Sequence, residues 1–325
     1  WNFPFWQVFR FAAPAMMAGN TVLLKHAPNV PGVSMGLEKL FWAADFPQGS
    51  FQSLLIDLPL TEGLIRDPRV AGVTLTGSPA AGRRVAALAG EHLKKCVLEL
   101  GGSDPFVVLE DAPLEEALDT AVKARIQNSG QTCIAAKRLI VHRKHKAFFE
   151  EALARRFRAL RVGDPLDPKT EIGPLARLDL VQTLHGQVEE SVKAGAKILC
   201  GGEPMRRSGF FYSPTVLVGA GKGQPCWDEE TFGPVAALAS ADTDDEALKM
   251  ANDTPYGLGA SLWTKDSKRV QEYASRIEAG SVFVNGMVKS DCRLPFGGIK
   301  RSGFGRELGP EGIREFTNVK TIWVK

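Results

Sequence analysis

The sequence lacks long hydrophobic runs and lacks an excess of charge of either sign. Residues 11–24 carry no charged side chain, but they include Pro14 and Gly19 and are fewer than the ~18 apolar residues that a membrane span needs. Forty Lys and Arg residues against 37 Asp and Glu residues leave a net charge of +3, which is too balanced to attract phosphate backbones. We therefore expect neither a membrane protein nor a nucleic-acid partner.

Cysteine is scarce and scattered, and no metal-binding pattern is present. Five cysteines form no C-x-x-C pair, and the five histidines form no H-x-x-x-H pair, so neither a disulfide framework nor a zinc site is indicated. A G-x-S-x-G motif is also missing, which argues against a serine hydrolase. We expect no metal and a reducing compartment, the cytoplasm.

The chain begins at Trp1 without an initiator methionine and without a basic and then apolar targeting segment. Asn2-Phe3-Pro4 is typical of the end of a strand. We therefore expect an N-terminally truncated chain.

What is present is an ordinary soluble composition with regular alternation. The 325 residues are 44% apolar and 24% charged, which suits about two domains. β-Branched and leucine-rich runs alternate with helical patterns, which predicts βαβ units on a parallel sheet. The expected strands are residues 21–25, 53–56, 70–76, 95–100, 106–109 and 138–142, and the main expected helices are residues 33–44, 80–89, 114–128 and 147–160.

Two features of the sequence suggest where domains or segments end. Gly101-Gly102 interrupts the pattern, and we place a domain edge there. Residues 316–325 alternate as Val319, Thr321 and Trp323, which predicts an edge strand. Because edge strands tend to pair, this segment favours a homo-oligomer.

Cys133 is the first candidate for chemistry. It follows the small, polar segment Asn128-Ser129-Gly130-Gln131-Thr132. A cysteine reacts as the thiolate, which nearby cations or backbone N–H groups favour. The alternative is an inert, buried cysteine that packs as a small apolar side chain.

Glu99 is the second candidate. It lies in the run Cys96-Val97-Leu98-Glu99-Leu100, which is followed by Gly101 and Gly102. Desolvation would raise the pKa of a carboxyl group there toward the range of a general base. The alternative is a strand-end glutamate that faces water or pairs with Lys94.

Two strand ends could meet a cofactor. Thr76-Gly77-Ser78 ends a strand and starts a helix, so its N–H groups could bind a pyrophosphate, although Ser78 could equally be an ordinary N-cap. Lys25 ends another strand, where an open α/β sheet meets its ligands. Taken alone, Lys25 is only a lysine at the end of a strand.

Two charged clusters are open to a simpler interpretation. The acids of Asp228-Glu229-Glu230 precede Thr231-Phe232-Gly233-Pro234 and resemble a solvated loop. A basic run at Lys137, Arg138 and residues 142–146 is expected to form the solvated face of a strand-to-helix turn rather than a polyanion site.

Seven ordered segments resemble the aldehyde dehydrogenase superfamily from the first residue to the last. They are Trp1-Asn2-Phe3-Pro4, Gly19-Asn20 with Lys25, Thr76-Gly77-Ser78, Leu98-Glu99-Leu100-Gly101-Gly102, Gly130-Gln131-Thr132-Cys133, Glu230-Thr231-Phe232-Gly233-Pro234 and Pro295-Phe296-Gly297-Gly298. Within that superfamily, residues 25–30 and 101–106 are most similar to bacterial succinate-semialdehyde dehydrogenases of the Sad type.

The resemblance implies a covalent mechanism. Cys133 would add to an aldehyde, and the Asn2 amide with the Cys133 N–H would bind the oxyanion. Hydride transfer to a nicotinamide would leave a thioester, and Glu99 would deprotonate the water that hydrolyses it.

The resemblance also implies the cofactor residues, with NAD or NADP as the cofactor. Lys25 and Glu230 would bind ribose hydroxyls, Gly77 and Ser78 would lie beside the pyrophosphate, and Phe232 would contact the nicotinamide ribose. Strict NAD enzymes often carry a glutamate at the position of Pro28. Because proline cannot repel a 2′-phosphate, we expect NADP to be accepted, and both cofactors to be used.

The substrate residues implied are Arg10 and Ser290, which match an arginine and a serine that bind the distal carboxylate of succinate semialdehyde. A second arginine of that group is replaced by Gln127, with Arg125 two positions earlier. The prediction is oxidation of a small aldehyde, succinate semialdehyde, to the free acid.

The implied α/β architecture is a doubly wound cofactor domain, a catalytic α/β domain and a short oligomerisation strand. We assign them to residues 1–100, 101–303 and 304–325, in a homodimer or homotetramer. Three alternatives stay open: another small aldehyde as substrate, esterase chemistry at Cys133, and a truncated, non-catalytic product of the same fold. Reduction of NAD(P) by aldehyde would separate a dehydrogenase from the last two, and a panel of aldehydes would identify the substrate.

Overall fold

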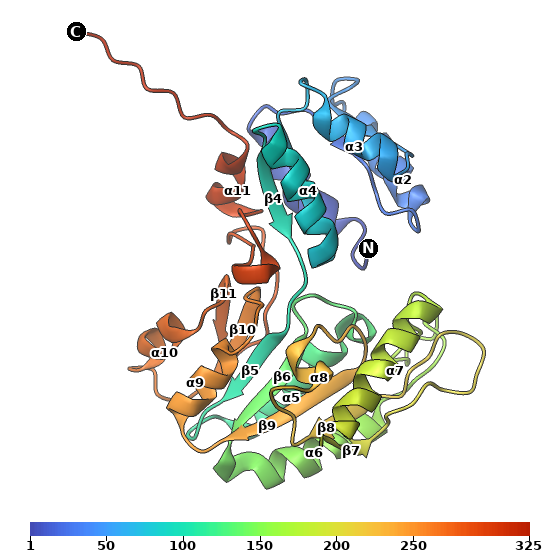
Figure 1. Ribbon diagram of the computed structural model, residues 1–325, viewed down its shortest axis with the longest axis vertical. Coiled ribbons are helices and arrows are strands. Elements are labelled where there is room, and N and C mark those ends of the chain that lie inside the picture. The colour runs from blue at the N-terminus through green and yellow to red at the C-terminus, as the bar shows by residue number, and fades with distance from the viewer. The chain divides into compact units, whose positions relative to one another are not determined.

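The computed structural model describes residues 1–325 as a mixed α/β chain that divides into two compact units (Figure 1). The first unit contains residues 1–100, 290–298 and 302–325, and the second contains residues 101–289 and 299–301.

The second unit is built on a seven-stranded sheet with the order β11-β10-β5-β6-β9-β8-β7. Every neighbouring pair is parallel except β7 and β8, which are antiparallel. The strands are β5 (Asp104–Val108), β6 (Ala136–His142), β7 (Lys197–Cys200), β8 (Thr215–Val218), β9 (Val235–Ala241), β10 (Gly259–Trp263) and β11 (Ser281–Val284).

Helices cover both faces of this sheet, because successive strand side chains point to opposite sides. Leu139 packs into the core under two helices, α5 (Leu114–Ile126) and α6 (Lys146–Ala159). Its neighbour Ile140 packs into a separate core on the other face. The remaining helices of this unit are α7 (Leu178–Lys193), α8 (Pro225–Asp228), α9 (Asp244–Asn252) and α10 (Val270–Arg276), with 3-10 turns η1 (Gln127–Gly130) and η2 (Arg143–His145).

The first unit contains two smaller sheets. Strand β1 (Val22–Leu24) pairs in parallel with β2 (Phe51–Ser53), and β4 (Lys95–Glu99) lies between β3 (Gly72–Thr76) and the antiparallel β12 (Gly303–Phe304). Phe41 stacks on Phe51 with ring centroids 4.4 Å apart. The helices are α1 (Trp6–Met17), α2 (Pro31–Ala43), α3 (Leu58–Arg66), α4 (Pro79–Glu91) and α11 (Gly309–Glu315). A 3-10 turn, η3 (Lys300–Ser302), lies where the chain passes from the second unit back to the first.

The predicted alternation of strands and helices is confirmed, with local differences. The second expected strand forms at Phe51–Ser53 instead of residues 53–56. The expectation that Asn2-Phe3-Pro4 ends a strand is wrong, because residues 1–5 form no strand and lead into α1, a helix that was not expected. Residues 317–325 form no strand within this chain, and Val319 and Trp323 are 99% and 80% exposed. A strand needs a partner for its N–H and C=O groups, so the oligomerisation strand stays a prediction. None of the helices combines the length and apolar composition that a membrane crossing requires.

The central strand of the large sheet offers a test of the core. Leu139 is fully buried in β6, so Leu139→Ala should lower the free energy of unfolding by about 2–5 kcal/mol. Chemical denaturation measures the change. The matched control is Leu166→Ala at a 90% exposed leucine, which should change stability by less than about 0.5 kcal/mol; equal losses in both variants would contradict the described core.

Candidate functional site

The segment that leads to Cys133 has an unusual backbone. In η1, Asn128, Ser129 and Gly130 have φ values of +53°, +56° and +77°, and Cys133 itself is half-buried. Left-handed residues other than glycine cost about 1 kcal/mol or more each. The loop therefore keeps this shape only if its surroundings hold it.

Side-chain hydrogen bonds hold the loop. Ser129 Oγ accepts a hydrogen bond from the Gly173 N–H, and Gln131 Oε1 accepts one from the Ala176 N–H, both at 2.9 Å. A Cβ on Gly130 would collide with the Gly233 carbonyl. The loop before Cys133 is thus packed directly against the segment that follows Glu230.

Gly101 and Gly102 allow close approach at two sites. A Cβ on Gly102 would lie 2.7 Å from the Cys133 carbonyl oxygen, and one on Gly101 would overlap the Glu230 carboxylate. The Gly102 N–H instead donates to Glu230 Oε1 at 3.1 Å. The second unit therefore brings the Cys133 backbone and Glu230 together around these glycines.

Lys137 connects the same two features. Its Nζ donates to the carbonyl oxygens of Thr132 at 2.9 Å and Cys133 at 2.7 Å, and lies 3.7 Å from Glu230 Oε1. Burial lowers the pKa of Lys137, which the nearby Glu230 and Asp104 charges oppose. The expectation that Lys137 and Arg138 form a solvated basic face is wrong, because both are fully buried.

Arg125 is buried as well, and it bonds only to backbone. Its guanidinium donates to the carbonyls of Val235 at 2.6 Å and Thr231 at 3.1 Å, and also to Gly233. Gln127 is exposed, and its carbonyl accepts the Thr132 hydroxyl. Arg125 Nη1 is buried without a hydrogen-bond partner. Because Arg125 has no exposed surface and its other donors bind backbone, it does not take the place of the arginine that was expected at position 127.

Glu230 and Phe232 lie on the same loop with different surroundings. The Glu230 side chain is 20% exposed, and burial raises the pKa of its carboxyl group while Lys137 opposes this change. Phe232 is half-buried. The solvated-loop interpretation is wrong for Glu230 and holds for the exposed Glu229.

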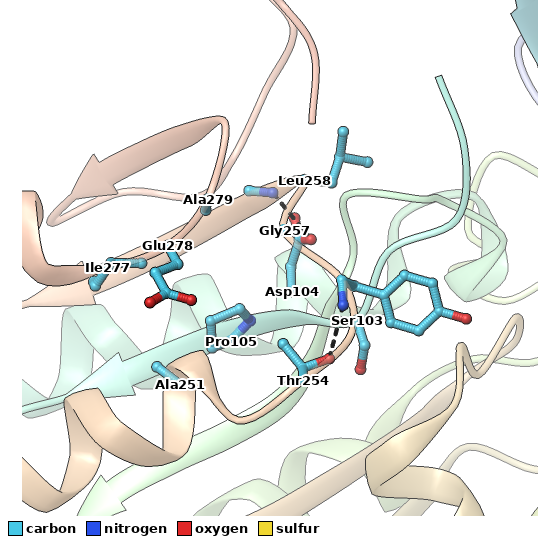
Figure 2. A pocket seen from close by; sticks show the side chains of 12 residues that line it. Ser103, Asp104, Pro105, Ala251, Thr254, Gly257, Leu258, Ile277, Glu278 and Ala279 are labelled. Carbon is cyan, nitrogen blue, oxygen red and sulfur yellow. Dashed lines mark hydrogen bonds between the residues drawn. The ribbon is translucent and has the colours of Figure 1, made fainter. Parts of the chain in front are cut away.

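Asp104 lies in a small pocket beside β10 (Figure 2). Its Oδ1 accepts the Gly259 N–H at 3.1 Å, while Oδ2 is buried without a hydrogen-bond partner. Burial raises the pKa of Asp104 to about 7, although Lys137 lowers it. Nothing in the sequence pattern singled out this carboxyl group.

The first unit places Glu99 at the end of β4, 2% exposed. Neither carboxyl oxygen has a hydrogen-bond partner, and a Cβ on Gly297 would lie 2.8 Å from Oε1. Burial and the charge of Glu307 raise the pKa of Glu99 well above its usual range. The alternative of a solvated glutamate paired with Lys94 is wrong, since the Lys94 ammonium binds the Asp67 carbonyl.

Arg10 lies on α1 and is 3% exposed. Its Nε is 2.8 Å from Glu307 Oε2, and its guanidinium lies 4.4 Å from the centre of the Phe296 ring. Sequence reasoning missed Glu307. The guanidinium already has a carboxylate partner, so a substrate carboxylate would share this cation with Glu307.

Two other first-unit residues offer polar groups. Asn2 Oδ1 accepts a hydrogen bond from Gln7 Nε2 at 2.8 Å, which orients the amide with its NH₂ group away from Gln7. Ser290 Oγ is buried and has no hydrogen-bond partner. An unpaired buried hydroxyl is costly unless a ligand or water satisfies it.

The expected cofactor residues of the first unit lie at strand and helix ends. Lys25 follows β1 and is half-buried, and Pro28 is exposed. Ser78 is the N-cap of α4, with Oγ accepting the Ala81 N–H at 3.3 Å, and Gly77 precedes it. The N-cap interpretation of Ser78 is therefore confirmed, and the helix start still presents N–H groups to an anion.

The predicted site residues thus fall into two groups. Asn2, Arg10, Lys25, Pro28, Gly77, Ser78, Glu99 and Ser290 belong to the first unit, and Gln127, Cys133, Glu230 and Phe232 to the second. No group of three or more His, Cys, Asp or Glu side chains in residues 1–325 is arranged to hold a metal ion.

Comparisons with known proteins agree with the pattern of motifs. A model of the aldehyde dehydrogenase family matches residues 1–322. A protein of Synechocystis sp. named probable succinate-semialdehyde dehydrogenase [NADP(+)] is 53% identical over 324 residues, covering 100% of this chain and 71% of the relative.

Solved structures give the same result. A succinic semialdehyde dehydrogenase from Streptococcus pyogenes in complex with NADP+ has a TM-score of 0.97 at 38% identity, covering 100% of this chain and 71% of that one. An aldehyde dehydrogenase from Bacillus cereus in complex with NAD+ has a TM-score of 0.96 at 34% identity, covering 100% and 66%.

The buried Asp104 predicts a pH effect on stability. Its pKa of about 7 in the folded chain exceeds the ordinary value of 3.8, so the folded state keeps a proton that the unfolded state releases. The contribution of this group to stability therefore falls as pH rises from about 4 to about 7, by up to about 4 kcal/mol.

Asp104→Asn removes this titration and can still accept the Gly259 N–H. We expect the variant to match the wild type near about pH 4 and to exceed it in unfolding free energy near about pH 8. Urea denaturation across that range measures the difference. A constant difference between the two proteins at every pH would contradict the buried, protonated carboxyl group.

Proposed function

The chain belongs to the aldehyde dehydrogenase family, and from this premise we propose that it oxidises succinate semialdehyde to succinate with NADP+ or NAD+. Family membership makes it an NAD(P)-dependent oxidoreductase that acts on an aldehyde. The observation that carries the choice of substrate is the 53% identity, over the whole chain, to a protein named for that activity. The buried Arg10 cation and the unpartnered Ser290 hydroxyl support it.

The proposed reaction begins at Cys133. Its thiolate sulfur forms a bond to the aldehyde carbon, and the carbonyl oxygen takes up the negative charge. The Asn2 NH₂ group, oriented by Gln7, and the Cys133 N–H would donate to this oxyanion. The hydrogen bonds of Ser129 and Gln131 hold the loop before Cys133, which would limit how far the Cys133 N–H can move relative to its sulfur.

Glu99 would complete the reaction as a general base. When bound, NAD(P)+ accepts the hydride from the aldehyde carbon, which leaves a thioester on Cys133. Glu99 takes a proton from water, the water oxygen bonds to the acyl carbon, and the carbon–sulfur bond breaks to release the acid. A raised carboxyl pKa in a buried setting suits a base that works near neutral pH.

The residues present fit NAD(P). Glu230 offers a carboxylate at a place where Gly101 leaves no side chain in the way, and α4 offers its N-terminal N–H groups after Gly77 and Ser78. We assign Lys25 and Glu230 to ribose hydroxyls and Phe232 to the nicotinamide ribose. Pro28 adds no negative charge that would repel a 2′-phosphate.

We also propose the roles of the larger segments. Residues 1–100 would hold the cofactor, residues 101–303 would carry the nucleophile, and residues 304–325 would pair with a second subunit in a homodimer or homotetramer. The exposed Val319 and Trp323 support pairing. Five free cysteines suit a reducing compartment such as the cytoplasm.

The role of Glu99 predicts burst kinetics. Glu99→Gln keeps the shape of the side chain but cannot accept the proton of water, so thioester hydrolysis should slow by about 10²–10³-fold. Stopped-flow absorbance should then show one equivalent of reduced cofactor per active chain, followed by slow turnover.

The pH dependence of hydrolysis in the wild type is the comparison for Glu99→Gln. Because the base must be ionised and its pKa is raised, the wild-type hydrolysis rate should increase with pH through the neutral range, and that dependence should be lost in Glu99→Gln. Loss of the burst itself would assign Glu99 to an earlier step instead.

The substrate assignment predicts a charge preference. Succinate semialdehyde should exceed propanal in kcat/KM, and Arg10→Lys should reduce that preference by about tenfold, since an ammonium cannot bind a carboxylate through two parallel N–H donors. Lysine retains a cation for Glu307. Ser290→Ala should act in the same direction.

An aldehyde panel measures both variants. The kcat/KM of each variant for propanal should stay within about threefold of the wild-type value, because the methyl end of propanal forms no hydrogen bond or ion pair with Arg10 or Ser290. Equal turnover of charged and neutral aldehydes by the wild type would contradict the choice of succinate semialdehyde.

A further inference from the structure

The ammonium group of Lys137 is surrounded by oxygen atoms from two separate parts of the second unit. It donates to the Thr132 and Cys133 carbonyls, and more weakly to the Ala135 carbonyl at 3.5 Å. Glu230 Oε1 completes the set at 3.7 Å. The side chain has no exposed surface.

A fully buried lysine is unusual, because removing an ammonium from water costs several kcal/mol unless oxygens replace the water. The backbone carbonyls alone could be satisfied by a neutral donor. The Glu230 carboxylate is different, since a mostly buried carboxylate stays ionised only with a cation close by. Lys137 is the only Lys, Arg or His within ion-pair distance of Glu230 among residues 1–325.

We propose that Lys137 is a positioning residue that keeps the Glu230 carboxylate ionised for a cofactor hydroxyl and ties it to the backbone that carries Cys133. The inference rests on the proposed role of Glu230 in binding the ribose. The proposal assigns Lys137 no contact with the substrate or the cofactor. It acts through the charge of Glu230 and through the carbonyls of Thr132 and Cys133.

The neighbouring charges identify Lys137 as the controlling group. Glu230 interacts with Lys137 on β6 and Arg125 on α5, which favour the carboxylate, and with the Gly102 N–H. Asp104 on β5 and Tyr256 before β10 are the acidic groups that interact with it. Arg125 Nε and one terminal nitrogen are bonded to backbone carbonyls, and its other terminal nitrogen is buried without a hydrogen-bond partner. Arg125 forms no ion pair with Glu230, so Lys137 is the cation in contact with the carboxylate.

The proposal predicts how cofactor affinity should depend on pH when Lys137 is replaced. Without Lys137, the pKa of the mostly buried Glu230 should rise further, so a larger share of the group should be protonated at a given pH. A protonated carboxyl group is a weaker acceptor for a ribose hydroxyl. Cofactor affinity should then improve as pH increases and Glu230 loses its proton.

The test measures the Kd of NADP+ by fluorescence titration, without aldehyde, between about pH 6 and about pH 9. Lys137→Met removes the charge and the donors, and Lys137→Gln removes the charge but keeps N–H donors for the carbonyls. Both should bind at least about tenfold more weakly than the wild type at the lower pH and recover as pH rises. NAD+, which has no titrating 2′-phosphate, should give the same trend.

A double-mutant cycle identifies the route of the effect. Glu230→Gln should weaken binding without the added pH dependence, because the amide does not titrate. Lys137→Gln combined with Glu230→Gln should bind no more weakly than Glu230→Gln alone, since the two residues act through one carboxylate. Additive losses would overturn the inference.

Arg138→Gln is the matched control. Arg138 is as buried as Lys137, but its donors bind only the carbonyls of Ser103, Met250 and Ala251. It should lower thermal stability and leave the pH profile of the Kd parallel to the wild type. A parallel profile in both Lys137 variants, or the same steep profile in Arg138→Gln, would overturn the proposal.

The result of the Lys137 test can be distinguished from the result of the test of the proposed function. A wild type that binds NADP+ but does not oxidise succinate semialdehyde contradicts the substrate assignment and leaves the Lys137 test intact. A wild type that binds neither NADP+ nor NAD+ overturns the role of Glu230, and the Lys137 inference with it.

Discussion

The second unit depends on buried cations that satisfy backbone carbonyls where regular hydrogen bonding stops. The loop before Cys133 has three successive left-handed residues, so its carbonyls are not paired as in a helix or a strand. Lys137 binds the Thr132 and Cys133 carbonyls, and Arg125 binds those of Thr231, Gly233 and Val235. An unpaired buried carbonyl costs about 1–3 kcal/mol, so these two side chains make an otherwise costly backbone stable.

The first unit uses the opposite arrangement, with carboxyl groups at its centre. Glu99 and Glu307 lie close enough for each to oppose ionisation of the other, and Arg10 compensates mainly Glu307. Burial raises the pKa of both carboxyl groups. Arg10 opposes this change for Glu307, and Arg10 and Arg306 oppose it for Glu99, whose pKa still lies well above its usual range. The electrostatic surroundings of the proposed general base are thus set by Glu307 and two arginines.

The sequence predicted the α/β alternation and two strands of the large sheet, β5 and β6, because their residues form apolar, β-branched runs. It predicted no ranges for β7 to β11. The local pattern left a simpler alternative open for both Cys133 and Glu99, and only the resemblance of the ordered motifs to a known family singled them out, so their roles stay predictions. The sequence did not predict α1, nor the burial of Lys137 and Arg138. Adjacent residues of a strand point to opposite faces, so a pair of neighbouring cations is expected to include an exposed one. Here both side chains bind backbone carbonyls. Lys137 binds those of Thr132 and Cys133, five and four residues earlier, where the chain turns back on itself. Arg138 binds those of Ser103, Met250 and Ala251, which are distant in sequence and do not appear in a local pattern.

The two glycines after β4 explain why these features occur together. Gly102 lies against the Cys133 carbonyl and Gly101 against the Glu230 carboxylate, so a side chain at either position would push the group that it meets away from this segment. Glu99 lies two residues before Gly101. The proposed base and both close approaches are thus encoded within four consecutive residues. The Cα atoms of Glu99 and Gly102 lie at most about 11 Å apart, because only three peptide units join them.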